Sequence, residues 1–400
     1  MGLRTAINNG DTGLVARTAI NNNFINSNIK VYNVEDYGAV HDGVTDDTEA
    51  IQDAINACFD AGGGIVYFPN GVYIIDGPLK NGIGEAGIDY NSQLYIPGTA
   101  IDDRGPKIIL LGESVSFYHH SDFDPSGVVL YSRNSENTGL YPSVICNRYI
   151  WGIHGYFSYT EVDMYNIHIV VSANEDANGP TMCGVNFLNS GRAFLDHVFV
   201  STDVAMEDTV EPVNNRFGIG LGEQNDDFPS FGRIVVMGGF YKGYVLGEGV
   251  HGMTLESYGN LFGLWCLGAS FGVRINYAIM HWNKYTLAPK ARTTLIIEYL
   301  STQVDSMRAV WSYNQDMFAD NSNYFYGYVN YILSSDAGLG VYQAKTHGGL
   351  NILIKNIYKD SYYHWGTTTR PADPGLGCMG FNTTTSKMEC WDGGAWRDLH

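Results

Sequence analysis

The stretch from Val31 to Ile75 constrains the fold of this chain more than any other. It begins with extended-type residues and a polar, glycine-containing loop, and an amphipathic helix comes next. Asp46 is a suitable N-cap for that helix, with Glu49 three residues later, and Gly62-Gly63-Gly64 ends it. The helix must lie on an apolar surface, because one of its faces is formed by Ala50, Ile51, Ala54, Ile55, Cys58 and Phe59.

After the glycines, two short apolar segments flank Asn70-Gly71. An Asn-Gly pair between β-type segments predicts a two-residue hairpin turn. We therefore expect Ile65–Phe68 and Val72–Ile75 to form a hairpin, and Pro69 leaves its exact register open.

The segments DYGAVHDGVTDDTEAIQDAI and GGGIVYFPNGVYII resemble the entry segment of the pectate-lyase-like right-handed β-helix proteins, a group that includes many bacteriophage tailspikes. In that family the helix covers the open N-terminal end of a parallel β-solenoid. The resemblance implies an all-β chain with a right-handed parallel β-helix over residues 31–365 and an N-terminal capping helix. It implies little about chemistry, and Asp42, Asp46 and Asp47 are expected to be loop and cap residues.

The rest of the chain agrees with this fold. Short apolar runs recur between about Asp163 and Tyr358 without helical periodicity, separated by glycine and asparagine, as in the rungs of a parallel β-helix. A two-sheet sandwich is the alternative, but hairpin signals are scarce and the runs are continuous rather than alternating. Strands are expected at Gln93–Ile96, Lys107–Leu111, Val128–Tyr131, Ser143–Cys146, Ile167–Val171, Val185–Leu188, Val198–Val200, Ile234–Met237, Tyr244–Leu246, Leu261–Leu267, Leu295–Leu300 and Ile352–Ile357.

Composition excludes several kinds of partner. The 400 residues carry 23 Lys plus Arg against 42 Asp plus Glu, a formal charge of −19. This balance argues against a nucleic-acid partner and against attraction to an anionic lipid surface. No apolar run is long enough to cross a bilayer, and Met1-Gly2-Leu3-Arg4 leads into an Asn-rich segment. We therefore expect synthesis in a cytoplasm, no export signal and no membrane insertion.

The six cysteines are widely spaced, and their spacing does not suggest a zinc site. Cys58, Cys183 and Cys266 lie within apolar patterns and are expected to be buried thiols. Cys378 and Cys390 flank a predicted hairpin, and their redox state stays open, since pairing is disfavoured in a reducing compartment.

Residues 1–30 differ from the rest of the chain. The hexapeptide Arg-Thr-Ala-Ile-Asn-Asn occurs at Arg4–Asn9 and again at Arg17–Asn22. A short helix here would be stabilised by docking on a partner or by bundling with copies of itself. The segment GDTGLVARTAINNNF resembles N-terminal segments of phage tail fibre and baseplate-associated proteins, which implies a virion-attachment segment. An ordinary solvated arm is the alternative.

Residues 366–400 are predicted to form a small C-terminal β module after a linker. The ending GFNTTTSKMECWDGGAWRDL resembles a short C-terminal repeat of phage tail fibres and some surface proteins. Trp391 and Trp396 either stack on a sugar ring or form the core of a module too small to have another. The expected strands are Cys378–Asn382, Lys387–Trp391 and Ala395–Leu399.

A glycan-cleaving site is one hypothesis for the solenoid face. Glycoside hydrolysis needs one acid to protonate the leaving oxygen and one carboxylate to activate water or attack carbon. Aligning Met253–Tyr258 with Arg292–Leu300 superposes Glu256 on Glu298, with Asn276 in the intervening turn. Two rungs would separate the carboxylates by about 9–10 Å, near the upper end of the inverting range. A hydrogen-bonded ladder of Glu and Asn is the alternative.

Aromatic residues near these acids in sequence are candidates for a sugar platform. Trp282 and Tyr299 are the main carbohydrate-binding candidates, and Tyr258, Tyr277 and His281 lie close by. The Ca²⁺-binding Asp cluster and the Arg or Lys base of a pectate lyase are not found, nor is a phosphate-binding loop or a nucleophile elbow. We expect neither a metal nor a cofactor.

Together these features favour a phage tailspike or tail fibre subunit that binds host surface polysaccharide during adsorption, with depolymerisation left open. The resemblance implies a homotrimer in the virion, attached to other tail or baseplate proteins through residues 1–30. Two alternatives stay open: a structural tail protein without glycan contact, and a bacterial polysaccharide lyase or hydrolase.

Overall fold

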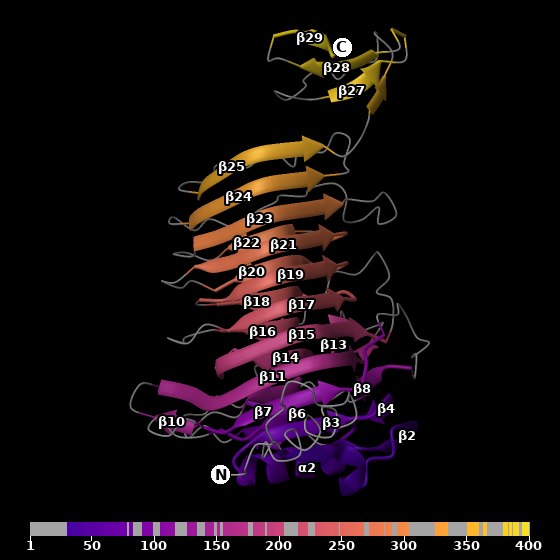
Figure 1. Ribbon diagram of the computed structural model, residues 1–400, viewed down its shortest axis with the longest axis vertical. Helices are drawn as coiled ribbons and strands as arrows, with labels where there is room; N and C mark the ends of the chain where they lie inside the picture. Colours follow the sequence, from indigo (N-terminus) through magenta and orange to yellow (C-terminus); the bar gives the residue numbers. More distant parts are fainter. Residues whose placement is uncertain are drawn as a thin grey trace, which may run out of the picture.

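The chain folds into a stack of parallel strands in which each rung lies on the one before it (Figure 1). The expected parallel β-helix is therefore confirmed. The computed structural model describes residues 30–77, 80–82, 90–98, 105–116, 126–133, 141–147, 150–152, 155–174, 179–188, 190–203, 215–222, 229–247, 249–267, 272–283, 285–289, 294–303, 325–334, 350–359, 363–365, 379–382, 384–385, 387–391 and 394–399.

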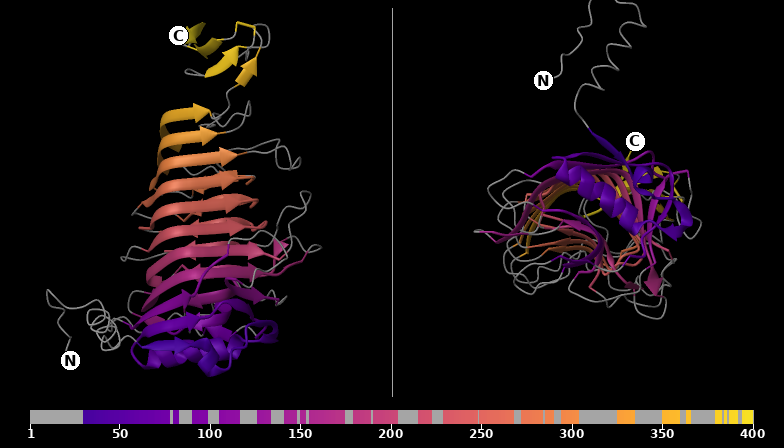
Figure 2. Two further views of the ribbon diagram at one scale, coloured as in Figure 1. Left: turned by 45° about the vertical axis from the view of Figure 1, so that its right-hand side comes forward. Right: turned by 90° about the horizontal axis from the view of Figure 1, so that it is seen from below.

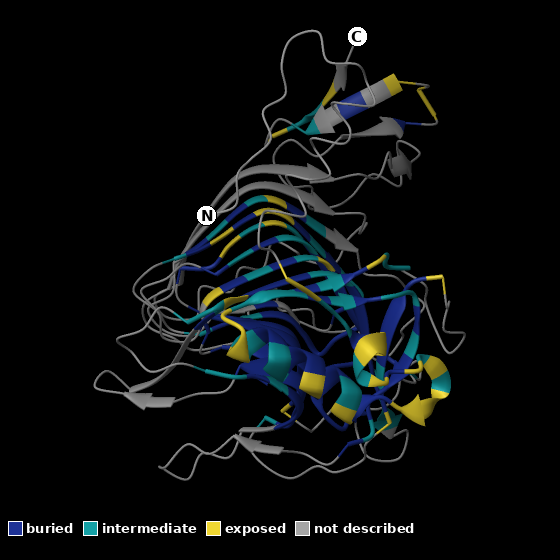
Figure 3. Ribbon diagram, turned by 60° about the horizontal axis from the view of Figure 1, so that its bottom comes forward, coloured by how far each residue is buried: buried dark blue, intermediate teal, exposed yellow. Residues whose placement is uncertain are grey.

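The helix α2 (Thr48–Asp60) lies across the N-terminal end of this stack, as the sequence predicts (Figure 2). One side of it faces solvent and the other is buried (Figure 3). The buried side consists largely of the expected apolar residues, of which Ile51, Ala54, Ile55 and Cys58 are inaccessible to solvent.

The loop before α2 is held by two neighbouring carboxylates. The N-cap position is Asp47 and not the predicted Asp46, and the Asp47 side chain makes no cap bond. Asp47 instead accepts the backbone N–H groups of Val40 (2.7 Å) and His41 (3.1 Å). Asp46 accepts the backbone N–H of Thr48 at 3.0 Å. Both acids therefore have structural partners, as expected for loop and cap residues.

Gln52 joins α2 to a rung of the solenoid. Its side-chain oxygen accepts the Tyr95 N–H at 2.9 Å, and its amide nitrogen donates to the Tyr95 carbonyl at 2.9 Å. The Gln52 side chain is 2% exposed. Its amide satisfies the backbone N–H and C=O of Tyr95, as a neighbouring strand would do.

Replacement of Gln52 by leucine is expected to lower the free energy of unfolding by about 3 kcal/mol, because both bonds to the Tyr95 backbone are lost in a buried place. Guanidinium-induced unfolding measures the change. Asp53→Leu, on the exposed side of the same helix, is the control and should shift stability by less than about 0.5 kcal/mol. Equal losses in the two variants would contradict the bridging role of Gln52.

The predicted hairpin at Asn70-Gly71 is wrong. The two flanking strands do not pair with each other, because the chain turns a corner between two parts of a rung. A Cβ at Gly71 would collide with His41, so the corner requires glycine. Each strand pairs in parallel with other rungs: β3 (Gly64–Phe68) with β1 (Val31–Asn33) and β7 (Lys107–Gly112), and β4 (Gly71–Ile74) with β2 (Asp42–Asp46) and β8 (Val128–Ser132). The 3₁₀ helix η1 (Val34–Tyr37) follows β1.

The larger sheet, called the long sheet from here on, extends along the whole stack. Both β7 and β8 pair with β11 (Gly155–Val171), so from β11 onward one strand serves both parts of the rung. In β11 and β15 the strand bends at a residue with positive φ, Asn166 (56°) and His197 (53°). The sheet continues through β15 (Ser190–Thr202), β17 (Ser230–Met237), β19 (His251–Tyr258), β21 (Val273–His281), β23 (Thr294–Gln303), β24 (Phe325–Ser334) and β25 (Leu350–Lys359), and β10 (Ile150–Gly152) is antiparallel to β11.

The second sheet, called the short sheet, closes the other side of the solenoid. Its strands are also parallel, apart from β5, which runs antiparallel to β6. In chain order they are β5 (Lys80–Gly82), β6 (Tyr90–Ile96), β9 (Ser143–Asn147), β14 (Cys183–Phe187), β16 (Phe217–Leu221), β18 (Lys242–Leu246), β20 (Phe262–Cys266) and β22 (Tyr285–Pro289), and a separate pair is β12 (Ala173–Asn174) with β13 (Gly179–Pro180).

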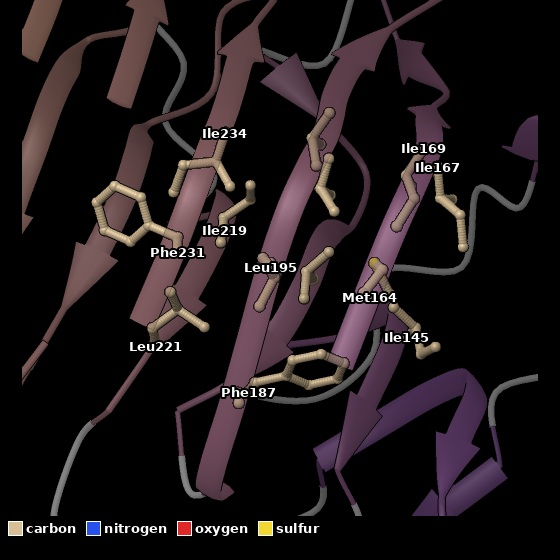
Figure 4. Packing of buried hydrophobic residues seen from close by; sticks show 14 of the residues in the cluster. Ile145, Met164, Ile167, Ile169, Phe187, Leu195, Ile219, Leu221, Phe231 and Ile234 are labelled. Carbon is tan, nitrogen blue, oxygen red and sulfur yellow. The ribbon is translucent and has the colours of Figure 1, made fainter. Parts of the chain in front are cut away.

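The two sheets meet in a continuous apolar core (Figure 4). Residues at the same height of successive rungs point inward together, so the core is a set of apolar rows that run along the stack. Such core residues include Met164, Leu195, Phe231 and Ile234 from the long sheet and Ile145, Phe187, Ile219 and Leu221 from the short sheet.

One part of the interior is polar. Ser257, Asn260 and Asn283 are at most 2% exposed and bond to one another. The Asn283 side-chain oxygen accepts the Asn260 N–H and the Ser257 hydroxyl, both at 3.0 Å, and its amide donates to the Ser257 carbonyl at 2.9 Å. This ladder satisfies backbone groups where the chain turns between sheets.

The chain ends in a small sheet made of the three predicted strands and one more: β26 (Tyr363–Trp365), β27 (Met379–Asn382), β28 (Lys387–Trp391) and β29 (Trp396–Leu399). β27, β28 and β29 form the expected antiparallel meander. β26 pairs with β27, so a domain boundary at 366 separates β26 from its own sheet.

Cys58, Cys183 and Cys266 are buried, as predicted. Burial raises the pKa of the Cys58 thiol to about 11 and that of Cys183 and Cys266 to about 12. The virion-attachment prediction for residues 1–30 falls almost wholly outside the described residues, as does Cys378. Within the described ranges, no helix combines the length and apolarity needed to span a bilayer.

Candidate functional site

The outer surface of the long sheet at β19, β21 and β23 is the most exposed aromatic region among the described residues, and we call it the β19–β23 face. In β21, Val273 and Ile275 are buried, whereas Arg274, Asn276 and Tyr277 are exposed. The two consecutive exposed residues mark the bend of the strand. The alternation therefore directs polar and aromatic side chains to solvent at this height.

The parallel register arranges these residues in rows. His251 of β19 pairs with Arg274, and Thr254 pairs with Tyr277, which places Met253 beside Asn276. In the same way β23 places Glu298 beside Asn276 and Tyr299 beside Tyr277. The outward residues of the face are His251, Met253, Thr254, Arg274, Asn276, Tyr277, Glu298 and Tyr299.

Tyr277 and Tyr299 form a stacked pair on this face. Their ring centroids are 4.9 Å apart and their planes differ by 9°. Tyr277 is 48% exposed and Tyr299 is 41% exposed, and Met253 beside them is 54% exposed. Large apolar side chains this exposed, gathered in one place, are typical of a binding surface.

The register also shows that the predicted alignment of Glu256 with Glu298 is wrong. Asn276 lies in the row of Met253 and Glu298, whereas Glu256 pairs with Ile279, three positions further along the strand. The sequence alignment assumed a rung of 20 residues, but the rung from Met253 to Asn276 has 23 (276 − 253). At ordinary strand dimensions the Cα atoms of the two glutamates are up to about 14 Å apart.

The Glu256 carboxylate has its own partners. It is 7% exposed, and it accepts the Arg233 Nε–H at 2.7 Å and the Tyr258 hydroxyl at 2.6 Å. Arg233 lies on β17, the side away from Glu298. Burial, followed by the hydrogen bond to Glu256, raises the pKa of Tyr258 well above its usual value. This arrangement fixes the guanidinium of Arg233 at the edge of the face.

Trp282 lies beside this cluster and is half-buried, so its ring is less open to a ligand than the two tyrosines. It packs against Tyr258 (centroids 5.7 Å) and His281 (6.2 Å). The His281 Nε2 lies 3.1 Å from the Ser301 hydroxyl, and burial lowers the pKa of His281. Among the described residues the buried Nε1 of Trp282 has no hydrogen-bond partner.

A second polar cluster lies on the long sheet nearer the N-terminal end. The Lys107 ammonium is 2.6 Å from the Asp163 carboxylate, and the Tyr165 hydroxyl donates to the same oxygen at 3.3 Å. Burial and the charge of Asp163 raise the pKa of Tyr165 to about 12. The carboxylate is thus already paired with a cation.

In the C-terminal sheet, Trp391 and Trp396 are direct cross-strand partners. Their centroids are 5.6 Å apart, their planes are tilted by 58°, and both are half-buried. This packing suits a small core, and both interpretations of the pair remain compatible with it.

Sequence reasoning named both Tyr277 and Tyr299 but missed that they stack, and it missed Arg274 and Met253 beside them. These residues come together only when the register between rungs is known, and loops of different length hide that register in the sequence. In the described part of the chain, no group of three or more His, Cys, Asp or Glu side chains is placed to hold a metal ion.

Residues 31–94 match the protein-family model described as rhamnogalacturonase A/epimerase, pectate lyase-like. The matched segment contains α2 and the first rungs. The β19–β23 face lies outside the matched residues.

Two of the sequence relatives match short stretches of this chain. Mannuronan C5-epimerase AlgE5 of Azotobacter vinelandii is 40% identical over 111 residues, which are 27% of this chain and 10% of that protein. Alginate lyase 7 of the same organism is 42% identical over 78 residues, 20% of this chain and 9% of that protein. The matches thus span about a tenth of the length of these relatives.

Solved structures align with large parts of the chain, but their TM-scores are low. The AlgE6 A-module of the Azotobacter vinelandii mannuronan C-5 epimerase is 16% identical with a TM-score of 0.33, covering 83% of this chain and 96% of that one. ORF18 of Geobacillus virus E2 is 12% identical with a TM-score of 0.29, covering 98% and 90%. Tailspike protein 3 of bacteriophage CBA120 is 12% identical with a TM-score of 0.24, covering 98% and 71%.

Proposed function

We propose that this chain is a phage tailspike or tail fibre subunit whose β19–β23 face binds a host surface polysaccharide during adsorption. The observation that carries the proposal is the exposed stacked pair Tyr277 and Tyr299 in the row next to Asn276 and Glu298. A sugar ring presents both apolar C–H surfaces and hydroxyl groups. Aromatic side chains beside amide and carboxylate groups suit both.

Two further observations support this function. The N-terminal segment resembles virion-attachment segments, and proteins that match short stretches of this chain are named for acting on mannuronan or alginate. In the proposed assembly the chain is a homotrimer in the virion, residues 1–30 contact other tail or baseplate proteins, and the solenoid projects toward the host.

In this proposal the chain binds the polysaccharide, and Glu256 and Glu298 do not cleave it. The two acids lie in different rows, and the Glu256 carboxylate is held by Arg233 and Tyr258. Incubation with a polysaccharide that binds, followed by measurement of chain length and new reducing ends, tests this point. Shortening that is lost in a Glu256→Gln/Glu298→Gln variant would restore the hydrolase hypothesis.

The double variant Tyr277→Ala/Tyr299→Ala is expected to bind its glycan at least about tenfold more weakly, because each lost ring contributes on the order of 1 kcal/mol. Binding of the full chain to an array of bacterial capsular and surface polysaccharides identifies the ligand, and titration measures the affinity. Val44→Ala is the matched control, because Val44 is 73% exposed near the opposite end of the solenoid.

Two results would contradict the proposal. Equal glycan binding by the double variant and the Val44 control would exclude the tyrosine pair as the site. No binding by the folded chain across the array would favour a tail component whose outer face is covered by other tail proteins.

A further inference from the structure

Within the described part of the chain Arg274 has no carboxylate partner, unlike three other cations of the long sheet. Three cationic side chains on the outer surface of this sheet are paired: Lys107 with Asp163 at 2.6 Å, Arg192 with Glu161 at 2.7 Å, and Arg233 with Glu256 at 2.7 Å. Arg274 is exposed, and among the described residues no acidic side chain lies within ion-pair distance of it.

The described residues next to Arg274 in its row are not acidic. Its row neighbour on β19 is His251, which is also exposed, and on β23 it is Ile296. Ser230 continues the row on β17. The nearest acid by register is Glu298, one strand over and two residues along, with Cα atoms about 8 Å apart at ordinary strand dimensions. Arg274 and His251 are thus two neighbouring basic side chains on the exposed surface.

The same strand carries the aromatic surface. Tyr277 lies three residues from Arg274, about 10 Å along the strand. On one side Tyr277 stacks on Tyr299, but its row neighbour on the other side is Thr254, whose short side chain leaves that face of the ring largely uncovered within the row. Arg274 is long enough to reach much of this distance, so a group held against Tyr277 comes within its range.

We infer that the β19–β23 face binds an acidic sugar, with the carboxylate of a uronic acid or a similar residue held by Arg274 and His251 and the sugar ring packed against Tyr277. This inference rests on the proposed glycan-binding function. A guanidinium binds a carboxylate with two parallel hydrogen bonds, which adds geometric selectivity to charge. A neutral glycan would leave Arg274 without a counter-charge.

Paired probes test the inference. The full chain is titrated with fragments of alginate, polygalacturonate and hyaluronan, and with the same fragments after chemical reduction of their carboxyl groups to alcohols. The acidic form is expected to bind at least about tenfold more tightly than the reduced form, and less so as salt rises. Arg274→Gln should remove this preference, lowering acidic binding about tenfold and leaving reduced-form binding within about twofold.

Lys30→Gln is the matched control, because Lys30 is an exposed cation beside β1, seven strands of the long sheet away from β21. It should leave both affinities unchanged. Equal binding of acidic and reduced fragments, or an equal effect of Arg274→Gln on both, would overturn the acidic-sugar inference alone. If neither form binds, the glycan site itself is overturned and this inference with it. The same holds if Tyr277→Ala/Tyr299→Ala binds each form as tightly as the unmodified chain does.

Discussion

Replacement of Phe231 by alanine is expected to lower the free energy of unfolding by about 3–5 kcal/mol. Phe231 is 2% exposed and projects into the core between the two sheets (Figure 4). Its ring lies directly against Gly252, its row neighbour on β19, where a Cβ would collide with ring carbons. The aromatic ring thus fills space that two rungs share. Guanidinium-induced unfolding, followed by tryptophan fluorescence, measures the loss.

A double-mutant cycle isolates this contact. Gly252→Ala should cost about 1–3 kcal/mol in the native chain, because the added methyl group displaces the ring. In the Phe231→Ala background the same methyl group enters vacated space, so its cost should fall by at least about 1 kcal/mol. Additive losses would show that the two positions do not share this space.

Replacement of Asn283 by alanine should have an effect of similar size. Asn283 is 2% exposed, and its side chain serves the Asn260 N–H, the Ser257 carbonyl and the Ser257 hydroxyl. Alanine leaves these groups without that partner in the interior. Since each unsatisfied buried group costs about 1–3 kcal/mol, we expect a total loss of about 3–5 kcal/mol in the same unfolding experiment.

Asn276→Ala is the matched control for this variant. Asn276 is an exposed asparagine on β21, and its amide contacts only the Met253 sulfur at 3.1 Å in the described structure. Its loss should change stability by less than about 0.5 kcal/mol. A similar small effect for Asn283→Ala would mean that water or a shifted loop replaces the ladder.

The fold could be predicted from local patterns. The apolar face of α2 and the glycines after it have no stable place except across an apolar end, and continuous apolar runs suit strands buried between rungs. The hairpin at Asn70-Gly71 failed because the turn rule considers only the two flanking strands. In this chain β3 and β4 find their hydrogen bonds in neighbouring rungs, and the Asn-Gly pair becomes a corner.

The site depended on register, which local patterns do not fix. Ile234, Leu255, Ala278 and Leu300 share one inward row, yet successive members lie 21, 23 and 22 residues apart (255 − 234, 278 − 255, 300 − 278). A difference of one to three residues in a turn moves every outward side chain to another row. Glu256 was therefore matched with the wrong partner.

The position of α2 also bears on how this chain avoids assembling with itself. A parallel stack has no internal reason to stop, because the backbone at the end of one stack can accept a strand from a second chain, as in a cross-β fibril. By lying across the first rungs, with Gln52 bonded to Tyr95, α2 obstructs such end-to-end addition at that end. Mutations that loosen the helix should therefore appear first as fibre growth during expression, before any loss of rungs is detectable in the purified protein.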